Sequence, residues 1–525
     1  MACYHRDVTL PQGWDGMRVT MLFGGVSSAM YLWVNGSYVG YSQVSRSPAE
    51  FDVSGLLRPG GNTVAVQVHR WSDGSYLENQ DMWFYSGIFR SVELRAEPLV
   101  RLDDVGLGSV VDLRRGTAAL TVAARIGTGN RASPPADPLE HGWEVQVAVC
   151  RDGEEIASAG AAVMYPGGEP RNPVAELVVD AGGVDLWTAE TPALYDVYVT
   201  LVDPTGVTVD VRRVRHGFRS VEIRDGQLLL NGVAVLLTGV NRHDLDPVSG
   251  ATMTAQRLRE DVALIKRANI NAVRTSHYPD DERFYDLCDE VGLYVMDEAD
   301  FESHAVRRKV PGDDPLWTAA CIDRAERLVG RDRNRACVIM WSLGNEAGFG
   351  TNHEAMAARV RSLDPSRPIH YEGDHRAEVT DVFSAMYPPA GAVRRACEGK
   401  GYWLVRTTLA EGIWQGAPGC AEPARRRALR AVRVRPLHGK QPGRHREVPR
   451  GVPLAAQLHR RVHLGLRGPG VAPRTARRNR HVGTRRRPER RVGLRRHVRQ
   501  RDRGGGPHPR IPPTTRLRRR SRTWR

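Results

Sequence analysis

The stretch Cys337-Val-Ile-Met-Trp-Ser-Leu-Gly-Asn-Glu-Ala-Gly348 indicates the fold of this 525-residue chain. Its apolar run from Val338 to Trp341 is too short for a helix and is typical of a buried strand. An amide and a carboxylate, Asn345 and Glu346, follow where the strand should stop. In a parallel α/β barrel the C-terminal ends of the strands carry the chemistry. Glu346 is therefore a candidate general acid beside an Asn that could hold a substrate hydroxyl. The alternative is that Glu346 only caps a helix beginning near Thr351.

Residues 219–400 alternate strands with amphipathic helices, which predicts βα units. Six strands are predicted: Val235–Val240, Asn271–His277, Leu293–Glu298, the strand before Glu346, Ile369–Gly373 and Val382–Pro388. Polar residues stand at their C-terminal ends, which favours one site at the top of a barrel. These residues include His243, Arg274, His277, Glu302, His304 and Tyr387. Glu302, His304 and Glu346 would supply two carboxylates and an imidazole, a set suited to a divalent metal ion.

The first 218 residues show period-2 strands with Gly and Pro turns and no helical pattern. We expect one β-sandwich over 1–98 and a second over 99–218. Asn35-Gly36 between two short strands predicts a type I′ hairpin. The segment Trp71–Trp83 mixes aromatic and polar groups that suit a sugar, although a packed surface loop is the simpler interpretation.

Charge is distributed unevenly along the chain. Residues 401–525 hold 35 Lys and Arg against five Asp and Glu, whereas the first 400 residues hold 41 against 55. The tail has too few apolar residues to offset the entropy of ordering, so we expect it to be disordered. The seven cysteines are scattered and include no Cys-x-x-Cys, which indicates a reduced, cytoplasmic protein rather than a disulfide framework or zinc site. No apolar run is long enough to span a membrane.

Several long motifs, met in order over about residues 2–390, resemble the β-galactosidases of glycoside hydrolase family 2. They are Trp71-Ser-Asp-Gly-Ser-Tyr-Leu-Glu, Gly239-Val-Asn-Arg-His, Val273-Arg-Thr-Ser-His-Tyr-Pro, Asp297-Glu-Ala-Asp-Phe-Glu-Ser-His and Trp341-Ser-Leu-Gly-Asn-Glu. The resemblance implies a multidomain β and α/β protein: a jelly-roll sugar-binding domain (1–98), an immunoglobulin-like sandwich (99–218) and a TIM barrel represented by its first six strands (219–400). An Arg-rich tail (401–525) would follow.

The resemblance also implies the site residues. Glu346 would be the acid/base of a retaining mechanism, and Glu302, His304 and Glu346 would bind Mg²⁺. Asn345, His243 and His277 would hold the galactose and the transition state, and Arg274 and Tyr387 would flank the nucleophile. The substrate would be a β-galactoside such as lactose, and intact family members are expected to be homo-oligomers.

Three departures from the family pattern stand out. Family members carry a longer N-terminal region before the Cys3-Tyr motif. Val44 stands where some members have an Asp that helps bind Na⁺, which makes a sodium site doubtful. The seventh barrel strand, which should read like Cys-Glu-Tyr-Ala-His-Ala-Met-Gly-Asn and supply the nucleophilic Glu, is absent.

The missing strand can be recovered in another reading frame. Arg433-Val-Arg-Pro-Leu-His-Gly-Lys-Gln can be encoded by bases that, started one base later, spell Glu-Tyr-Ala-His-Ser-Met-Gly-Asn. His463-Leu-Gly-Leu-Arg-Gly-Pro-Gly470 gives Ile-Trp-Asp-Phe-Val-Asp-Gln at the same offset, similar to the family's eighth-strand motif. One frameshift between about 389 and 425 would explain both, and also the Arg/Pro/Gly/Ala richness of the tail.

Three functions follow from these observations. The first is a β-galactosidase-family glycosidase made inactive by loss of its nucleophile. The second is a carbohydrate-binding remnant without turnover. The third is a polyanion binder acting through the basic tail, whose binding would be non-specific and salt-dependent. The tail lacks interleaved aromatic residues and any DNA-binding module, which argues against a specific nucleic-acid partner.

Overall fold

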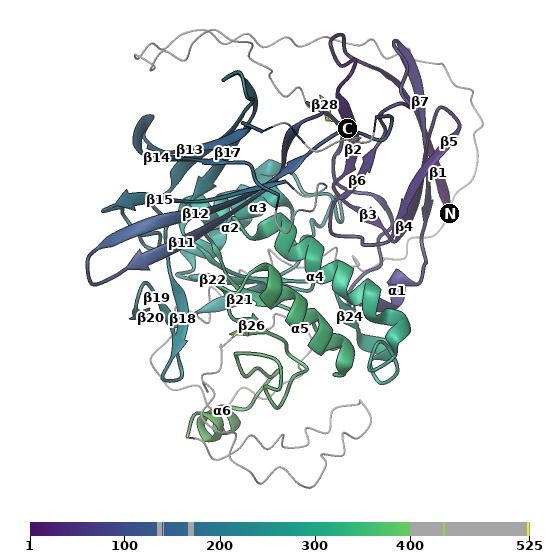
Figure 1. Cartoon of the computed structure of the whole chain (residues 1–525). Helices are drawn as coiled ribbons and strands as arrows, with labels where there is room; N and C mark the ends of the chain where they lie inside the picture. The colour runs from purple at the N-terminus through teal and green to yellow at the C-terminus, as the bar shows by residue number, and fades with distance from the viewer. Residues whose placement is uncertain (134–138, 140, 166–172, 399–433, 436–521, 524–525) are drawn as a thin grey trace, which may run out of the picture.

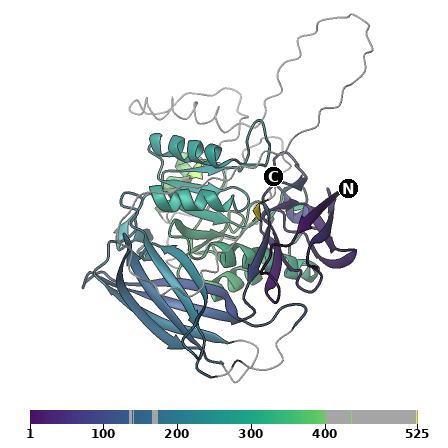
Figure 2. The same ribbon diagram turned by 90° about the horizontal axis from the view of Figure 1, so that it is seen from above.

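A computed structural model of the chain describes residues 1–133, 139, 141–165, 173–398, 434–435 and 522–523. Two β-sandwiches flank a parallel barrel sheet with its helices, as Figure 1 and the view from above in Figure 2 show. The fold class predicted from the sequence is confirmed: a jelly-roll-like sandwich, an immunoglobulin-like sandwich and a TIM-barrel domain that is incomplete in the described residues. Most of the predicted tail lies outside the described residues.

The first sandwich consists of two antiparallel sheets around an apolar core that includes Met21, Leu32 and Val66. One sheet has the order β1 (Ala2–Thr9), β7 (Gly61–His69), β4 (Ala29–Val34), β5 (Ser37–Ser42); the other contains β10 (Val92–Glu97), β2 (Arg18–Phe23) and β6 (Ala49–Asp52). The short β28 (Arg522–Thr523) pairs with β10, and β3 (Val26–Ser27) pairs with β9 (Gly87–Ile88). Asn35 and Gly36 both have positive φ, 50° and 81°, as the predicted type I′ turn between β4 and β5 requires.

The second sandwich follows the predicted period-2 pattern, with alternate residues of its strands buried in one core. Its sheets have the orders β11 (Arg101–Asp112), β12 (Thr117–Gly127), β15 (Val174–Gly182) and β14 (Glu154–Ala162), β13 (Glu144–Arg151), β16 (Tyr195–Val202), β17 (Thr208–His216). None of the predicted site residues lies in this domain.

The barrel sheet is parallel, with the order β26, β25, β23, β22, β21, β27. Its strands are β21 (Gly239–Arg242), β22 (Ala272–Thr275), β23 (Tyr294–Glu298), β25 (Val338–Ser342), β26 (Ile369–His370) and the two-residue β27 (Val434–Arg435). The helices described in this domain are α2 (Ala255–Arg267), α3 (Glu282–Val291), α4 (Thr318–Asp332), α5 (Thr351–Leu363) and α6 (Ala390–Cys397). Side-chain caps define two helix starts: Thr254 accepts from the Arg257 amide, and Asp281 accepts from the Arg283 amide.

Two predicted strand positions are wrong. The first strand begins at Gly239 rather than Val235, because the Val235 amide bonds to Leu228 O and continues the small antiparallel sheet β18 (Val221–Arg224), β19 (Gln227–Leu230), β20 (Val233–Ala234). The sixth strand, Val382–Pro388, does not form. Tyr387 has φ of 51°, which a strand cannot accommodate, and the prolines after it have no amide hydrogen to donate.

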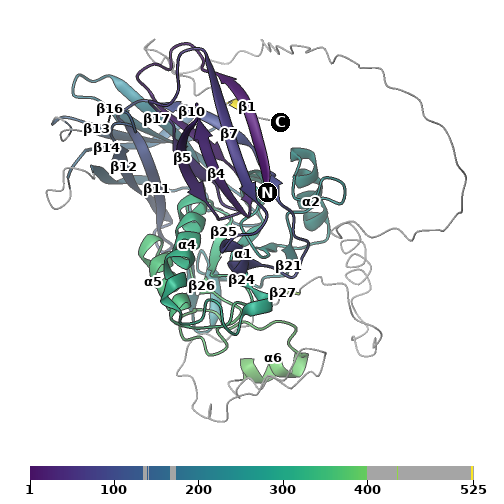
Figure 3. The same ribbon diagram turned by 90° about the vertical axis from the view of Figure 1, so that its right-hand side faces the viewer.

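A short segment of the first sandwich crosses to the barrel. It contains α1 (Gly74–Leu77) and β8 (Glu78–Asn79), and β8 pairs in parallel with β24 (Glu302–Ser303) beyond the third barrel strand. Figure 3 shows α1 beside β24 below the sheet of β4 and β7. Two 3₁₀ turns, η2 (His304–Val306) and η3 (Pro315–Trp317), complete this side. Part of the predicted site is therefore built against the first domain.

Candidate active site

Glu302, His304 and Glu346 converge at the C-terminal edge of the barrel sheet. One ligand atom from each lies within 4.8 Å of the others, and His304 Nε2 is 3.2 Å from Glu346 Oε2. Glu302 is 1% exposed, and its Oε2 has no hydrogen-bond partner within the described part of the chain. Burial and the neighbouring Glu346 carboxylate raise the pKa of Glu302 well above its usual range. A cation would relieve this repulsion and give Oε2 a partner, so the three residues fit a divalent metal site.

The turn after β25 holds Glu346 in an uncommon backbone conformation. Gly344 has φ of 142°, Glu346 of 31° and Gly348 of 70°. A Cβ on Gly344 would lie 2.3 Å from Phe301 O, and one on Gly348 would lie 2.4 Å from Arg307 O. The two glycines therefore let the turn pack directly against backbone. The alternative in which Glu346 caps the next helix is wrong, because Asp313 Oδ1 accepts from the first amide of α5, that of Thr351.

Arg274, His277 and Asn345 form one buried network around Glu298. The Arg274 guanidinium donates to Glu298 Oε2 (2.7 Å) and to Asn345 Oδ1 (2.9 Å), and His277 Nδ1 is 2.7 Å from Glu298 Oε1. Burial alone would raise the pKa of Glu298, but Arg274, His277 and Ser342 together lower it to about 2. Glu298 therefore remains ionised and orients Arg274 and His277, two of the predicted site residues, while Arg274 in turn orients Asn345.

Sequence reasoning gave no role to four residues that line the same region. Ser342 Oγ donates to Glu298 Oε2 (2.7 Å), and His370 Nδ1 lies 2.9 Å from Ser342 Oγ. Tyr371 accepts from the Ala347 amide. Burial and Glu346 raise the pKa of Glu372 to about 7. The pattern of polar residues at strand ends could have identified His370, Tyr371 and Glu372, since they lie in the predicted fifth strand near its end. Ser342 lies within the stretch Cys337–Gly348, just before Asn345 and Glu346.

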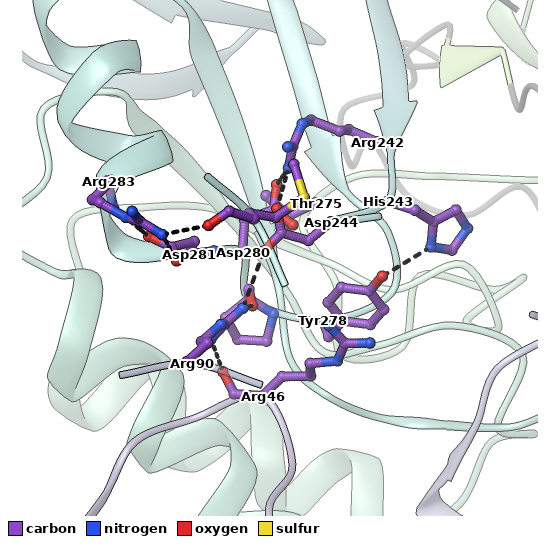
Figure 4. Close-up of polar contacts among 12 residues, drawn as sticks. Arg46, Arg90, Arg242, His243, Asp244, Thr275, Tyr278, Asp280, Asp281 and Arg283 are labelled. Carbon is purple, nitrogen blue, oxygen red and sulfur yellow. Dashed lines mark hydrogen bonds and ion pairs between the residues drawn. The ribbon is translucent and has the colours of Figure 1, made fainter. Parts of the chain in front are cut away.

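His243 lies on the wall of the site nearest to the first sandwich. Its Nδ1 is 3.3 Å from the hydroxyl of buried Tyr278, and its ring centroid is 5.6 Å from that of His277. The guanidinium carbon of Arg46, from the first sandwich, lies 4.0 Å from the Tyr278 ring centroid. Arg90 donates to Arg46 O (2.6 Å). Figure 4 shows this sequence of contacts from the first domain to His243.

Behind His243, a fully buried Arg242 anchors the end of β21. It forms ion pairs with Asp244 (3.0 Å), Asp261 (3.1 Å) and Asp280 (2.5 Å), of which Asp244 and Asp280 are seen in Figure 4. Burial alone would lower its pKa, but the three carboxylates raise it well above its usual value. The cluster fixes the backbone that carries His243.

The segment Trp71–Trp83 is more than a surface loop. Its aromatic side chains are exposed, with Trp71 at 56% and Trp83 at 53%, but its polar residues hold the barrel. Glu78 accepts from Arg324 of α4 (2.7 Å), and Gln80 donates to Asp300 Oδ1 (3.0 Å). Burial and Asp300 favour a neutral Glu78 by raising its pKa to about 8, whereas the short contact with Arg324 favours the ionised form. The charge-assisted bond from Arg324 keeps the two groups paired.

Two further residues singled out in the sequence, Tyr387 and Val44, differ in their exposure to solvent. Tyr387 is 55% exposed, and burial of its remaining surface together with Glu346 raises its pKa to about 12, so it lies near the carboxylates without a described strand to hold it. Val44 is buried and offers no side-chain oxygen to a cation.

The six cysteines in the described ranges are free thiols. Among the described helices, none combines the length and the apolar character needed to cross a bilayer.

An (α/β) barrel with paired carboxylates at its strand ends, preceded by two β-sandwiches, is the architecture of a multidomain glycoside hydrolase. Models of the glycosyl hydrolases family 2 match the chain three times: the sugar binding domain at residues 1–98, the family 2 domain at 102–219 and the TIM barrel domain at 221–402. The chain belongs to this family.

Named relatives and solved structures agree with this assignment. A β-galactosidase of Pectobacterium atrosepticum is 42% identical over 394 residues, covering 73% of this chain and 37% of the relative. A β-galactosidase of Alteromonas mediterranea is 42% identical over 391 residues, covering 73% of this chain and 36% of the relative. The chain thus spans little more than a third of these relatives. A β-glucuronidase of Bifidobacterium dentium has a similar fold, with a TM-score of 0.63, 22% identity and coverage of 76% and 71%. A β-glycosidase of Bacteroides vulgatus also has a similar fold, with a TM-score of 0.61 and 23% identity; the match covers 74% of this chain and 48% of that one.

Proposed function

We propose that this chain carries most of the active site of a retaining β-galactosidase and that, as written, it lacks the nucleophile. The reaction would release terminal β-D-galactose from β-galactosides such as lactose. The observation that carries this proposal is the convergence of Glu302, His304 and Glu346 beside the Arg274–Asn345 pair. The β-galactosidase relatives at 42% identity favour galactose over the sugars of other family members.

Glu346 is the proposed acid/base. It lies in the turn after β25 and its side chain is a quarter exposed, so that a leaving oxygen can reach it. As the glycosidic bond breaks, the Glu346 carboxyl gives its proton to the leaving oxygen, and the carboxylate then takes a proton from water. His304 and Arg307 lie 3.2 and 3.6 Å from Glu346 Oε2 and would orient it.

Galactose binding is assigned to the buried network around Glu298. Arg274 holds the Asn345 side-chain oxygen, and the Asn345 amide group also donates to the Glu302 carboxylate, so one amide hydrogen remains to donate to a sugar hydroxyl. His277 is oriented by Glu298, and His243 by Tyr278. Mg²⁺ bound by Glu302, His304 and Glu346 would supply positive charge beside the acid/base. Because these side chains are already held in place by their hydrogen bonds, a bound sugar would be oriented relative to Glu346 without further rearrangement of the site.

A retaining glycosidase needs a second carboxylate about 5–5.5 Å from the first. By the family resemblance this residue belongs to a seventh strand that the sequence after residue 400 does not encode in its present frame. Glu298 is not a substitute, because it is fully buried and bonded to Arg274, His277 and Ser342. Without a nucleophile the chain would bind galactosides but not turn them over.

The test compares the chain as written with a frame-corrected version in two assays. Calorimetry with a non-hydrolysable thiogalactoside measures binding, and a chromogenic β-galactoside measures hydrolysis. We expect hydrolysis only in the corrected chain. Substantial turnover by the chain as written would contradict the proposal, and failure of both versions to bind the thiogalactoside would exclude the galactoside site.

A reduced, cytoplasmic setting is proposed alongside this function, because the six described cysteines are unpaired with one another.

A further inference from the structure

Two of the three metal-site residues are followed by an alanine whose amide is bound by a side chain from elsewhere in the fold. The Ala305 amide, next to His304, donates to Asn79 Oδ1 (2.8 Å). The Ala347 amide, next to Glu346, donates to the Tyr371 hydroxyl (3.0 Å). These two contacts set the backbone of two predicted ligands from outside the ligand set.

We propose that Asn79 and Tyr371 are positioning residues of the site formed by Glu302, His304 and Glu346. The inference rests on the metal site of the proposed function and adds two residues that touch neither the ion nor the substrate. It also makes the first sandwich, through Asn79, a part of that site.

Tyr371 holds the Glu346 turn at two points. Its hydroxyl accepts from the Ala347 amide and donates to Gly348 O (2.5 Å), so one oxygen holds the backbone at both of the residues that follow Glu346. The ring itself is fully buried and stacks on His353 with centroids 4.5 Å apart. A rigid ring is needed here because Glu346 has φ of 31°, a conformation that a non-glycine residue keeps only when its surroundings impose it.

Asn79 acts on the other side of the site. It lies in β8, which pairs in parallel with β24 so that Glu78 is opposite Glu302 and Asn79 opposite Ser303. Glu78 is itself anchored by Arg324 (2.7 Å). The strand pairing sets Glu302, and the bond from Asn79 to the Ala305 amide sets the turn that begins with His304.

The experiment measures Mn²⁺ affinity of the full chain by electron paramagnetic resonance, with no substrate present. Outer contacts of this kind change metal affinity about 10–100-fold. We expect Tyr371→Phe, which removes one hydroxyl, to weaken Mn²⁺ binding by that factor. Tyr285→Phe is the matched control: Tyr285 is equally buried, and its hydroxyl bonds to the Asp280 amide (3.0 Å) and Asp297 (2.5 Å), away from the site. It should leave Mn²⁺ affinity unchanged.

Asn79 provides a second, independent variant pair. Asn79→Ala removes the acceptor and should weaken Mn²⁺ binding, whereas Asn79→Asp keeps an oxygen for the Ala305 amide and should restore most of it. Asn62→Ala is the control within the same sandwich, because Asn62 accepts from the Arg58 amide (2.7 Å) far from β8. A general loss of domain stability would affect Asn62→Ala as well.

The outcomes separate the two proposals. Mn²⁺ binding that Glu302→Gln abolishes establishes the metal site in the unaltered chain; no such binding would overturn the site and this inference together. If the site is present but folded Tyr371→Phe and Asn79→Ala bind Mn²⁺ as tightly as the parent, only the positioning role is wrong. Circular dichroism of each variant verifies folding.

Discussion

Glu346 illustrates how much of the site is set by one residue and its backbone. Its carboxylate belongs to the predicted metal site and is also the proposed proton donor, and His304 and Arg307 both lie within 4 Å of it. In a frame-corrected chain, Glu346→Gln should lower kcat by about 10²–10⁴-fold, because positioned acid–base groups contribute that much. The loss should be smaller for substrates with good leaving groups, as measured with a series of aryl galactosides.

An equal loss for every leaving group would instead mean that Glu346 acts mainly through the metal. Glu354→Gln, on the first turn of α5, is a control for removing a carboxylate nearby in sequence. It should leave kcat unchanged.

His353 gives the chain a pH-dependent stability. It packs among Phe301, Phe349 and Tyr371, and burial lowers its pKa to about 4. The unfolded chain protonates this histidine near pH 6.5, before the folded chain does, so stability should fall as the pH drops from about 6.5 to about 4. The slope is at most about 1.4 kcal/mol per pH unit.

His353→Phe removes this titration and should flatten the pH dependence of Tm in that range, as followed by scanning calorimetry. His5→Gln is the control, since the His5 side chain is 65% exposed. An unchanged pH profile in His353→Phe would show that other groups dominate acid unfolding.

At the scale of single residues, the sequence predicted which three side chains converge but not which contacts hold them in place. Glu302, His304 and Glu346 could be predicted because each stands at a strand end in a recognisable motif. The roles of Glu298 and Tyr371 depend on contacts between strands that are far apart in the chain, such as Ser342 to Glu298, and no local pattern encodes such contacts.

The turn after β25 is the element on which the site depends most. Gly344→Ala should destabilise the fold for two reasons. An alanine at φ of 142° costs about 1–3 kcal/mol in backbone strain, and its Cβ would also clash with Phe301 O at 2.3 Å, so the total loss should exceed the strain alone. Urea unfolding measures the loss. Gly330→Ala is the matched control: Gly330 lies in α4 with open space around its Cβ position, and the change should stabilise the chain by up to about 1 kcal/mol.

Equal effects of the two alanines would contradict the steric argument.

At the scale of elements, the alternation of strands with helices and the positions of the central strands were predicted well, because apolar periodicity and short apolar runs are local signals. Val382–Pro388 failed because an apolar run becomes a strand only where a neighbour can pair with it. Here Val382 packs onto Met296 and Met340, and the chain turns at Tyr387.

For the whole molecule, the decisive prediction concerns the reading frame. Shifting the frame by one base between codons 389 and 425 should restore a Cys-Glu-Tyr motif whose Glu codon straddles Arg433 and Val434. The corrected chain should hydrolyse a chromogenic β-galactoside, and the uncorrected chain should not. A gene with no open frame through that offset would contradict this account.

The corrected chain with the restored Glu changed to Gln is the control, since it keeps the repaired tail but not the nucleophile.

The predicted disorder of residues after 400 falls almost entirely outside the described residues and stays a prediction. Composition alone could identify that region as different, because its charge and its apolar content both change near the end of the family match at residue 402.

The pairing of β8 with β24 has a consequence for anyone who wishes to recombine these domains. A barrel excised at residue 219 would lose the strand beside Glu302, the partner of the Ala305 amide and the carboxylate that neutralises buried Arg324. Such an excised barrel should be insoluble or metal-free even with all of its own strands intact. The first sandwich and the barrel are therefore not interchangeable modules, and a chimaera must take both from the same parent.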